Sequence, residues 1–388
     1  MLAAPAAQAA EAPLSKRLAS ALAVPHVNHS LESALAVDLR SGTVVFARRP
    51  AASLAPASNE KLVLSYALLV RFGPAYRIPT LLLGEGRREG ATWRGDLVLV
   101  GLGDPALKTA GLRRLARQVR ALGISHVTGS IAGDESFFDE QRVGPGWKPE
   151  FYIEESPPLS ALVVDRAEYR GRVNRNPALA AASQFRAVLA EEGVTVQRKS
   201  TVRPARDEAV ELARIASPPL LKLLRIVNSD SDNFTAEVLL KHVGAVEGDG
   251  GTTKAGAAVV RGVLADAGVP LAGVRFVDGS GLSLLDRLTA QALVAILEAA
   301  WDDPLLRGSF LASLAVAGRR GTLEDRMRRA PAAGRVFAKT GTTSLASTLS
   351  GYADGRYAFA ILHNGPPLSS WWCRMAQDRF ATALVRAP

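Results

Sequence analysis

The sequence predicts an α/β protein in which one folded unit is interrupted by a second one. Two stretches far apart in the chain have the pattern of antiparallel strands, one between Ser33 and Arg48 and the other between residues 335 and 362. Between about residues 78 and 216 the sequence pattern changes to short strand-like runs separated by turn residues. A chain of 388 residues with 48% apolar and 22% charged residues is long enough to bury the cores of two or three domains.

The first part of the chain is predicted to form a hairpin followed by a helix. Residues Ser33 to Arg48 alternate apolar and polar around Arg40-Ser41-Gly42, as the strands of a half-buried hairpin require. Pro56 restricts the backbone just before Ser58, and apolar residues recur at helical spacing from Lys61 to Arg71. We therefore expect Ser58 to lie in the first turn of a helix.

Beyond the interrupting segment, the chain is predicted to return at Pro218 and Pro219. Leu220 to Ile226 and Phe234 to Val243 have the apolar spacing of two helices. The polar loop from Asn228 to Asn233 lies between them, so its side chains are expected at the end of a helix pair.

The end of the chain is predicted to complete the sheet. Strand-length runs and a terminal helix occupy residues 335–340, 345–352, 357–362 and 371–385. They form an antiparallel meander closed by a C-terminal helix. The predicted domain borders follow: residues 14–79 and 216–388 make one discontinuous domain, and residues 80–215 make an inserted domain.

The composition limits the possible partners. The formal net charge of +10 comes largely from scattered arginines, and a positive surface attracts polyanions such as nucleic acid or an anionic cell envelope. The sequence has no basic module interleaved with aromatic residues and no zinc-finger spacing, so no nucleic-acid partner is predicted. Apolar runs such as Leu62 to Val70 fall well short of the ~18 residues of a membrane span, so no transmembrane segment is predicted.

Two features bear on export and redox chemistry. Residues 1–13 are rich in alanine and proline, and Ala7-Gln8-Ala9 has the small-x-small form of a signal-peptide cleavage site. We expect this segment to be either a disordered leader or the remnant of an export signal. Cys373 is the only cysteine, so an internal disulfide is excluded and a buried, idle thiol is expected.

Three short motifs carry the chemical prediction. Ser58 is the only serine with a lysine three positions later, at Lys61, and Ser231 is the only serine with an asparagine two positions later, at Asn233. The only Lys-Ser/Thr-Gly triplet is residues 339–341. Each motif alone is weak, but their order and their places on a helix, a loop and a strand make the combination specific.

The first motif predicts an activated serine. Residues three apart on a helix share a face, so the amine of Lys61 can approach the hydroxyl of Ser58. A serine hydroxyl is a poor nucleophile until a base takes its proton. Lys61 must therefore be kept neutral, either by desolvation or by a nearby cation such as Lys339. Taken alone, the motif favours a capping serine followed by a solvated helix lysine over a catalytic pair.

The second motif predicts a proton relay. Side chains two apart in an extended loop point the same way, so Ser231 and Asn233 should face one site. Ser231 can pass a proton to a departing amine, and Asn233 can hold a substrate amide and the side chain of Lys61. The neighbouring Asp230 and Asp232 are expected to be solvated loop residues or helix caps.

The third motif predicts a binding edge for a peptide. Lys339 and Thr340 supply a positive charge and a hydroxyl for a substrate carboxylate, and Gly341 lets a peptide lie close to the strand. An oxyanion also needs donors, and the backbone N–H groups of Ser58 and Thr342 are the natural pair.

Together with further segments, these motifs closely resemble those of low-molecular-mass class C penicillin-binding proteins of the DacB type. The likeness runs from about residue 30 to the end of the chain. The further segments are Gly101-Leu102-Gly103-Asp104-Pro105, Gly133-Asp134-Glu135-Ser136-Phe137-Phe138, Val164-Asp165-Arg166, Ser229-Asp230-Ser231-Asp232-Asn233, Asp278-Gly279-Ser280-Gly281-Leu282-Ser283 and Gly321-Thr322-Leu323.

The resemblance implies a fold, a reaction and a location. The fold is a penicillin-binding transpeptidase/β-lactamase-like α/β domain, with a five-stranded antiparallel sheet flanked by helices and with an inserted α/β domain. The reaction is that of a serine D-alanyl-D-alanine carboxypeptidase/endopeptidase, which cleaves peptidoglycan stem peptides or cross-bridges through an acyl-serine, without metal or cofactor. β-Lactam antibiotics would be covalent inhibitors, and the protein would be exported to the periplasm or the cell exterior.

The resemblance also implies a role for each motif residue. Ser58 corresponds to the nucleophile and Lys61 to the general base. The second motif is represented by Ser231 and Asn233, and the third by Lys339, Thr340 and Thr342. Two departures stand out. The stretch after Val164-Asp165-Arg166 is short, and Leu284 and Ser344 stand where some relatives that recognise diaminopimelate carry Arg and Gln.

Other functions are disfavoured by what the sequence lacks. A β-lactamase needs a group that activates water for fast deacylation, and no Glu-x-x-x-Asn segment lies between Ser231 and Lys339. The histidines show no His-Glu-x-x-His arrangement of a zinc peptidase, and there is no Gly-x-Ser-x-Gly elbow. The remaining alternative is a catalytically silent protein that holds wall peptides in the same cleft. The oligomeric state is left open.

Overall fold

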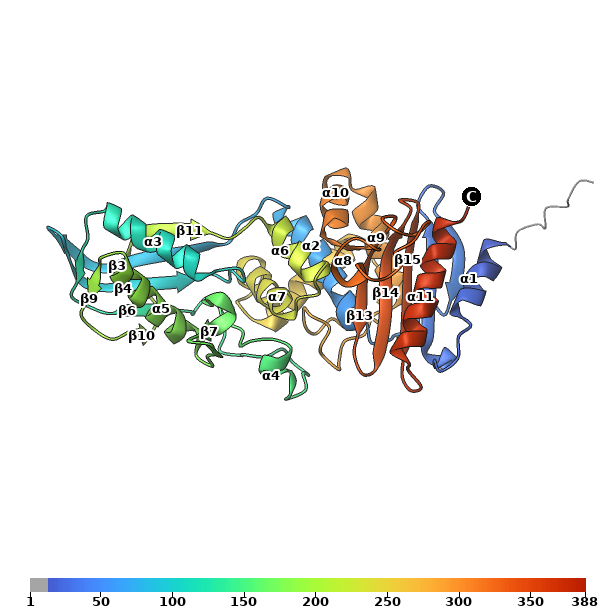
Figure 1. The fold of residues 1–388 in the computed structure, drawn as a ribbon, viewed down its shortest axis with the longest axis horizontal. Helices are drawn as coiled ribbons and strands as arrows, with labels where there is room; N and C mark the ends of the chain where they lie inside the picture. The colour runs from blue at the N-terminus through green and yellow to red at the C-terminus, as the bar shows by residue number, and fades with distance from the viewer. Residues whose placement is uncertain (1–12) are drawn as a thin grey trace, which may run out of the picture.

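The computed structural model describes residues 13–388 and has a sheet towards each end of an elongated molecule, with helices between the two sheets (Figure 1). Ala7-Gln8-Ala9 and nearly all of the expected leader lie outside the described residues. Among the described residues no helix is both long enough and apolar enough to cross a bilayer.

The first sheet is antiparallel and joins the two ends of the chain in the order β12-β13-β14-β15-β1-β2. Its strands are β1 (Glu32–Asp38), β2 (Thr43–Arg48), β12 (Ala315–Val316), β13 (Val336–Thr342), β14 (Ala346–Ala353) and β15 (Tyr357–Asn364). The predicted hairpin and meander are confirmed, and β1 closes the sheet by pairing with β15. The sixth strand, β12, has two residues and was not predicted.

Helices cover both faces of this sheet, which explains why every residue of β14 and β15 is buried. On one face lie α1 (Leu14–Leu22) and α11 (Ser370–Val385), which pack against Phe359 and Ile361 (Figure 1). The intervening residues Ala360 and Leu362 face the opposite core, because successive strand side chains point to opposite faces. Cys373 of α11 is buried, and burial raises the pKa of its thiol to about 11.

The helices on the other face carry the Ser58 region and the loop that follows α6. They are α2 (Glu60–Phe72), α6 (Leu220–Asn228), α7 (Asn233–Glu247), α8 (Thr253–Asp266), α9 (Ala290–Asp302) and α10 (Pro304–Ser313). The predicted helices of these regions are confirmed with slightly different ends. Ser58 lies in a short 3-10 turn, Ala57–Asn59, immediately before α2.

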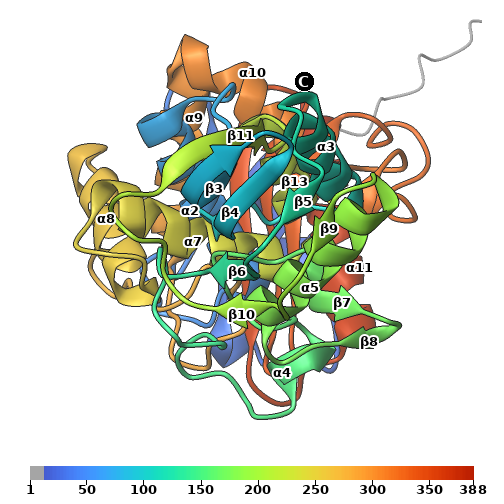
Figure 2. The same cartoon turned by 90° about the vertical axis from the view of Figure 1, so that its left-hand side faces the viewer.

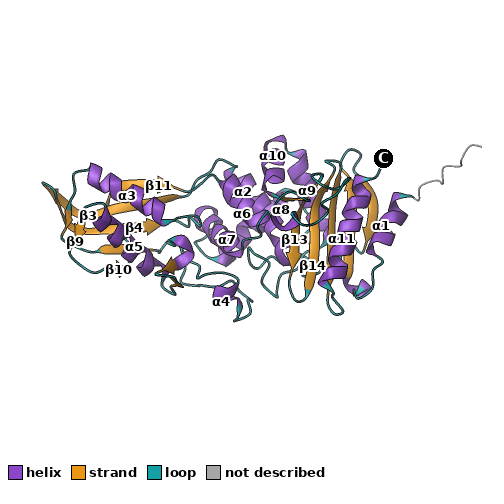
Figure 3. Cartoon of the chain, viewed as in Figure 1, coloured by secondary structure: helices purple, strands orange, loops and turns teal. Residues whose placement is uncertain are grey.

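A second sheet is built from the interrupting segment, and Figure 2 shows it facing the viewer. Its strands are β3 (Pro79–Glu89), β4 (Thr92–Gly101), β5 (His126–Val127), β6 (Ile131–Asp134), β9 (Thr195–Val196), β10 (Thr201–Val202) and β11 (Val210–Ala216). The central order is β10-β6-β4-β3-β11, and α3 (Thr109–Ala121) and α5 (Pro177–Glu191) pack on it around Leu115 and Phe185 (Figure 3).

The chain enters and leaves this second sheet at one place. β3 and β11 pair so that Pro79 lies opposite Ala216, and the backbone N–H of Ser217 donates to the carbonyl of Ile78 at 2.9 Å. The remaining small elements are α4 (Phe151–Glu154) and the pair β7 (Glu168–Tyr169) and β8 (Arg172–Val173). In Figure 1 these small elements lie below the second sheet, on the side of α7.

Candidate active site

The three motifs meet in one cavity of about 620 Å³ beside the start of α2 and the edge of β13. Ser58, Ser231, Asn233, Thr340 and Thr342 line it. Lys61, Lys339 and Gly341 are buried against it. Part of the wall comes from the interrupting segment, through Lys148, Phe151 and Glu155. A larger groove between α1 and α11, of about 810 Å³, contains none of the motif residues.

The amine of Lys61 makes three short contacts. Its Nζ lies 2.9 Å from Ser58 Oγ, 2.8 Å from Asn233 Oδ1 and 2.6 Å from the carbonyl oxygen of Ser280. A neutral amine has two N–H donors and one lone pair. The two acceptors take both donors, which leaves the lone pair for the hydroxyl proton of Ser58. A protonated lysine would donate to all three oxygens, whereas the neutral form donates to Asn233 and Ser280 and can accept the hydroxyl proton of Ser58.

Burial is the main reason for the low proton affinity of Lys61. Desolvation lowers the pKa of Lys61 to about 8, against the opposing pull of the Asp278 and Glu237 carboxylates. Burial also lowers the pKa of Lys339 well below its ordinary value, and the charge of Lys61 adds to that effect. Of the two causes predicted for the neutral Lys61, desolvation is thus the larger.

The loop of the second motif is not extended, which corrects one prediction. Ser231 has φ of +65°, in the left-handed region, and Asn233 is the first residue of α7. Asp232 caps α7, because its carboxylate accepts a hydrogen bond from the backbone N–H of Thr235 at 2.7 Å. This N–H lies in the first turn of the helix and has no partner within the helix itself. It also pairs with Arg166 of the interrupting segment at 2.8 Å. The turn directs Ser231 towards Lys339, whose Nζ lies 2.8 Å from Ser231 Oγ.

The third motif packs directly on the turn that carries Ser58. A Cβ at Gly341 would lie 2.2 Å from Thr348 Oγ1 and 3.0 Å from the Cβ of Ala57, so only glycine lets β13 approach this closely. The side-chain amide of Asn59 donates to the carbonyl of Lys339 at 3.1 Å and ties the first motif to the third. The close packing of β13 on the turn of Ser58 therefore requires glycine at position 341, which the sequence analysis did not predict.

Four buried carboxyl groups lie close to Lys61, and their charges are coupled. Glu60, Glu237, Asp278 and Asp286 are each 0% exposed. Burial raises the pKa of Glu237 to about 8, and it raises the pKa of Glu60 and of Asp286 well above the ordinary range. Neither carboxyl oxygen of Glu60 has a hydrogen-bond partner among the described residues. Burial without a hydrogen-bond partner therefore favours the protonated, neutral form of Glu60.

We expect Glu60→Met to stabilise the protein at neutral pH. Folding raises the pKa of Glu60, so the folded state holds the Glu60 proton more tightly than the unfolded state does. The contribution of this group to the free energy of unfolding is therefore complete below the unfolded pKa near 4.5, and it is lost as the pH rises towards the folded pKa. Methionine has no such proton linkage, so we expect the stability difference to move in favour of Glu60→Met as the pH rises above about 4.5. The check is the free energy of unfolding of both proteins between pH 4 and 8, and an equal difference at every pH would contradict the assignment.

Comparison with solved structures defines the class of fold. Penicillin binding protein 4 (dacB) of Haemophilus influenzae superposes with a TM-score of 0.81, covering 95% of this chain and 98% of that one at 19% identity. Another structure of that protein, complexed with a β-lactam, gives a TM-score of 0.75 at 21% identity. The predicted penicillin-binding, β-lactamase-like fold with an inserted domain is thereby confirmed.

Sequence comparison identifies the family within that class. The family model of the D-Ala-D-Ala carboxypeptidase 3 (S13) family matches residues 14–176 and 168–384. A D-alanyl-D-alanine carboxypeptidase of an Actinomadura species is 30% identical over 88% of this chain and 79% of that protein. Carboxypeptidase Rv3627c of Mycobacterium tuberculosis is 30% identical over 98% of this chain and 86% of that protein.

The chain belongs to the S13 family of serine-type D-Ala-D-Ala carboxypeptidases. The predicted resemblance is confirmed. The family consists of enzymes of cell-wall peptidoglycan, which implies a location in the cell envelope.

Sequence reasoning assigned no role to three residues around Lys61. Ser280 and Asp278 stood in a segment quoted only for its resemblance, and Glu237 was not singled out. Glu237 has one detectable signal, since it lies one helical turn after Asn233 and therefore on the same face of α7. No local pattern indicates that the Ser280 carbonyl would accept from Lys61.

Proposed function

We propose that Ser58 is the nucleophile of this enzyme and that Lys61 is its general base. The 2.9 Å contact between Lys61 Nζ and Ser58 Oγ carries the proposal, because the other two contacts of the amine use both of its N–H donors. Ser58 Oγ attacks the carbonyl carbon of the penultimate D-alanine, and its proton moves to Lys61. A new C–O bond forms and the carbonyl becomes an oxyanion.

The second motif then completes the acyl transfer. The C–N bond of the tetrahedral intermediate breaks, and the departing amine receives, through the Ser231 hydroxyl, the proton that Lys61 took from Ser58, which returns Lys61 to its neutral form. Ser231 Oγ lies 2.8 Å from Lys339 Nζ. The terminal D-alanine leaves and Ser58 carries the acyl group. Water, deprotonated by the same base, hydrolyses that ester. Asn233 holds the substrate amide next to the Lys61 amine.

The substrate is held along the edge of β13. We infer that Lys339, Thr340 and Thr342 bind the terminal carboxylate of a peptidoglycan stem peptide, whose negative charge would favour the protonated form of the Lys339 amine. The backbone N–H groups of Ser58 and Thr342 receive the oxyanion, and losing one such donor costs about 3 kcal/mol. A cross-bridge presents the same amide, so endopeptidase cleavage follows the same steps.

A β-lactam meets the same nucleophile. We propose that its ring amide is opened by Ser58 to an acyl-enzyme whose deacylation is slow.

The catalytic unit would comprise residues 14–79 and 216–388, and the protein would work in the periplasm or at the cell exterior. The alternative is a silent wall-peptide binder, whose Ser58 would not be acylated.

Labelling with a fluorescent penicillin tests the nucleophile. We expect the wild-type protein to form a covalent adduct on the peptide containing Ser58, and Ser58→Ala to form none, because the attacking oxygen is gone. Ser53→Ala, on an exposed serine that donates to the Gly273 carbonyl, is the matched control and should label fully. An unlabelled wild-type protein would favour the silent binder, and a labelled Ser58→Ala would place the nucleophile elsewhere.

A further inference from the structure

The carbonyl of Ser280 is fixed by its own peptide bond. It accepts from Lys61 at 2.6 Å, and the N–H of the same peptide unit, on Gly281, donates to Asp278 Oδ1 at 2.7 Å. Gly281 has φ of +81°, and a Cβ there would lie 2.0 Å from the carbonyl oxygen of Ala57. The peptide therefore has little freedom to turn, and Asp278 sets the direction of the oxygen that orients the lysine.

Asp278 is itself held by donors from two parts of the chain. Its Oδ2 accepts from the backbone N–H of Ser283 at 2.8 Å and from the indole Nε1 of Trp147 at 2.7 Å. Asp278 is fully buried, and the carboxyl groups of Glu60 and Glu237 lie nearby. A buried carboxylate in such surroundings needs hydrogen-bond donors in place of water. The indole of Trp147 is the donor to Asp278 that comes from the interrupting domain.

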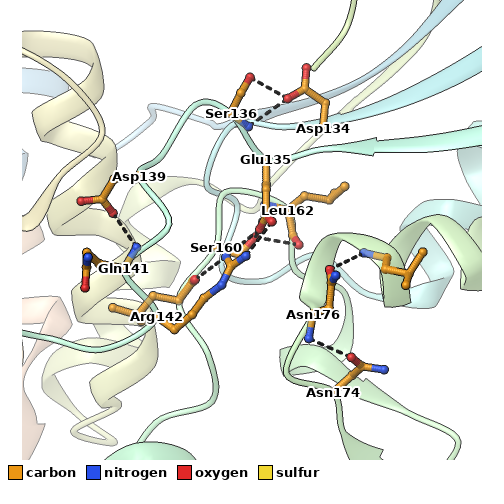
Figure 4. A network of polar contacts seen from close by, with 12 residues as sticks. Asp134, Glu135, Ser136, Asp139, Gln141, Arg142, Ser160, Leu162, Asn174 and Asn176 are labelled. Carbon is orange, nitrogen blue, oxygen red and sulfur yellow. Dashed lines mark hydrogen bonds and ion pairs between the residues drawn. The ribbon is translucent and has the colours of Figure 1, made fainter. Parts of the chain in front are cut away.

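Trp147 belongs to a segment that is anchored on the interrupting domain. Figure 4 shows Arg142 paired with Glu135, with contacts of 2.6 and 2.7 Å, and Ser160 donating to the same carboxylate. These residues flank the stretch 143–159, and Arg142 also donates to the carbonyl of Leu159 at 3.0 Å. Hydrogen bonds thus hold the two ends of the stretch together, and Trp147 within it contacts Asp278.

We propose that Trp147 is a positioning residue, through which the inserted domain holds Asp278, the Ser280 carbonyl and thereby the amine of Lys61 in line with Ser58. The inference rests on the proposed function, since it concerns the geometry of the proposed base. It gives the inserted domain a part in catalysis: its segment completes the support of Lys61 as well as forming a wall of the cavity.

The test is Trp147→Phe, which removes the N–H and keeps most of the ring. The matched control is Trp93→Phe, because Trp93 is a buried tryptophan of β4 whose Nε1 donates to the carbonyl of Asp96 at 3.2 Å, within the inserted domain. Acylation by a chromogenic β-lactam is followed to obtain the rate constant of acylation and the dissociation constant separately. We expect Trp147→Phe to lower the rate constant about 10-fold with an unchanged dissociation constant. Trp93→Phe should change neither.

A double-mutant cycle with Asp278→Asn tests whether the effect runs through Asp278. If the two residues act through one bond, the double variant acylates no more slowly than Asp278→Asn alone. A wild-type rate constant in Trp147→Phe, or a change confined to the dissociation constant, would overturn the positioning role while leaving Ser58 as the nucleophile. A wild-type protein that is not acylated at all would instead overturn the proposed function, and this inference with it.

Discussion

We expect Lys61→Ala to slow the acylation of Ser58 by a β-lactam at least ~100-fold, the loss expected when a general base is removed. The alanine removes the amine that would accept the Ser58 proton, because Lys61 Nζ lies 2.9 Å from the hydroxyl oxygen. The measurement is the second-order rate constant of acylation by stopped-flow spectroscopy. Lys222→Ala, on an exposed face of α6, is the control and should acylate at the wild-type rate.

The pH dependence of the wild-type acylation rate is a second test of Lys61 as the general base. Because burial lowers the pKa of Lys61 to about 8, the amine is protonated and inactive below that pH. The acylation rate should therefore rise with pH, about tenfold per unit at low pH, and level off above about 8. A rate that is flat between pH 6 and 9, or that falls, would show that another group takes the serine proton.

Lys339→Ala is expected to slow acylation at least ~100-fold as well, for an electrostatic reason. The lysine is 0% exposed, and its Nζ donates to the hydroxyl of Ser231 and to the carbonyl of Thr340 at 2.8 and 2.9 Å. Its loss would remove the amine that is proposed to hold the substrate carboxylate, and it would leave the Ser231 hydroxyl without this hydrogen bond. Rates measured for both lysine variants against one β-lactam make the comparison direct.

The choice of peptide separates the Lys339 effect from a general loss of structure. A peptide ending in D-Ala-D-Ala with a free carboxylate and the same peptide with an amidated end differ only in the charge that Lys339 is proposed to bind. The wild-type enzyme should prefer the free acid, and Lys339→Ala should lose that preference. If the variant keeps the preference, the carboxylate is bound elsewhere. Purified muropeptides, with products identified by mass, would then show whether stem ends or cross-bridges are cleaved.

The motif residues could be predicted because short-range geometry determines part of their arrangement. Serine and lysine three apart at a helix start share a face whatever surrounds them, and Asp232 before an apolar run is a helix cap on local grounds alone. The strands of the meander were predicted from their length and apolar content, and these agree with two buried faces.

The two-residue strand β12 and the left-handed turn at Ser231 were missed for a common reason. Ala315–Val316 is too short to show any period, and it is a strand only because β13 lies beside it. Ser231 has no glycine-like signature, yet its φ of +65° is required for the hydroxyl to reach Lys339. In both cases a contact far along the chain decides the local conformation.

The order and spacing of the three motifs, the interrupted α/β plan and the family were determined by the sequence itself, since each depends on residue type and separation along the chain. Only the tertiary structure decided the lowered pKa of Lys61, the raised pKa of Glu60, and the hydrogen bonds that connect Trp147 to Asp278 and the Ser280 carbonyl to Lys61. Burial and the approach of charges from distant segments set these properties, and neither quantity is a function of local sequence.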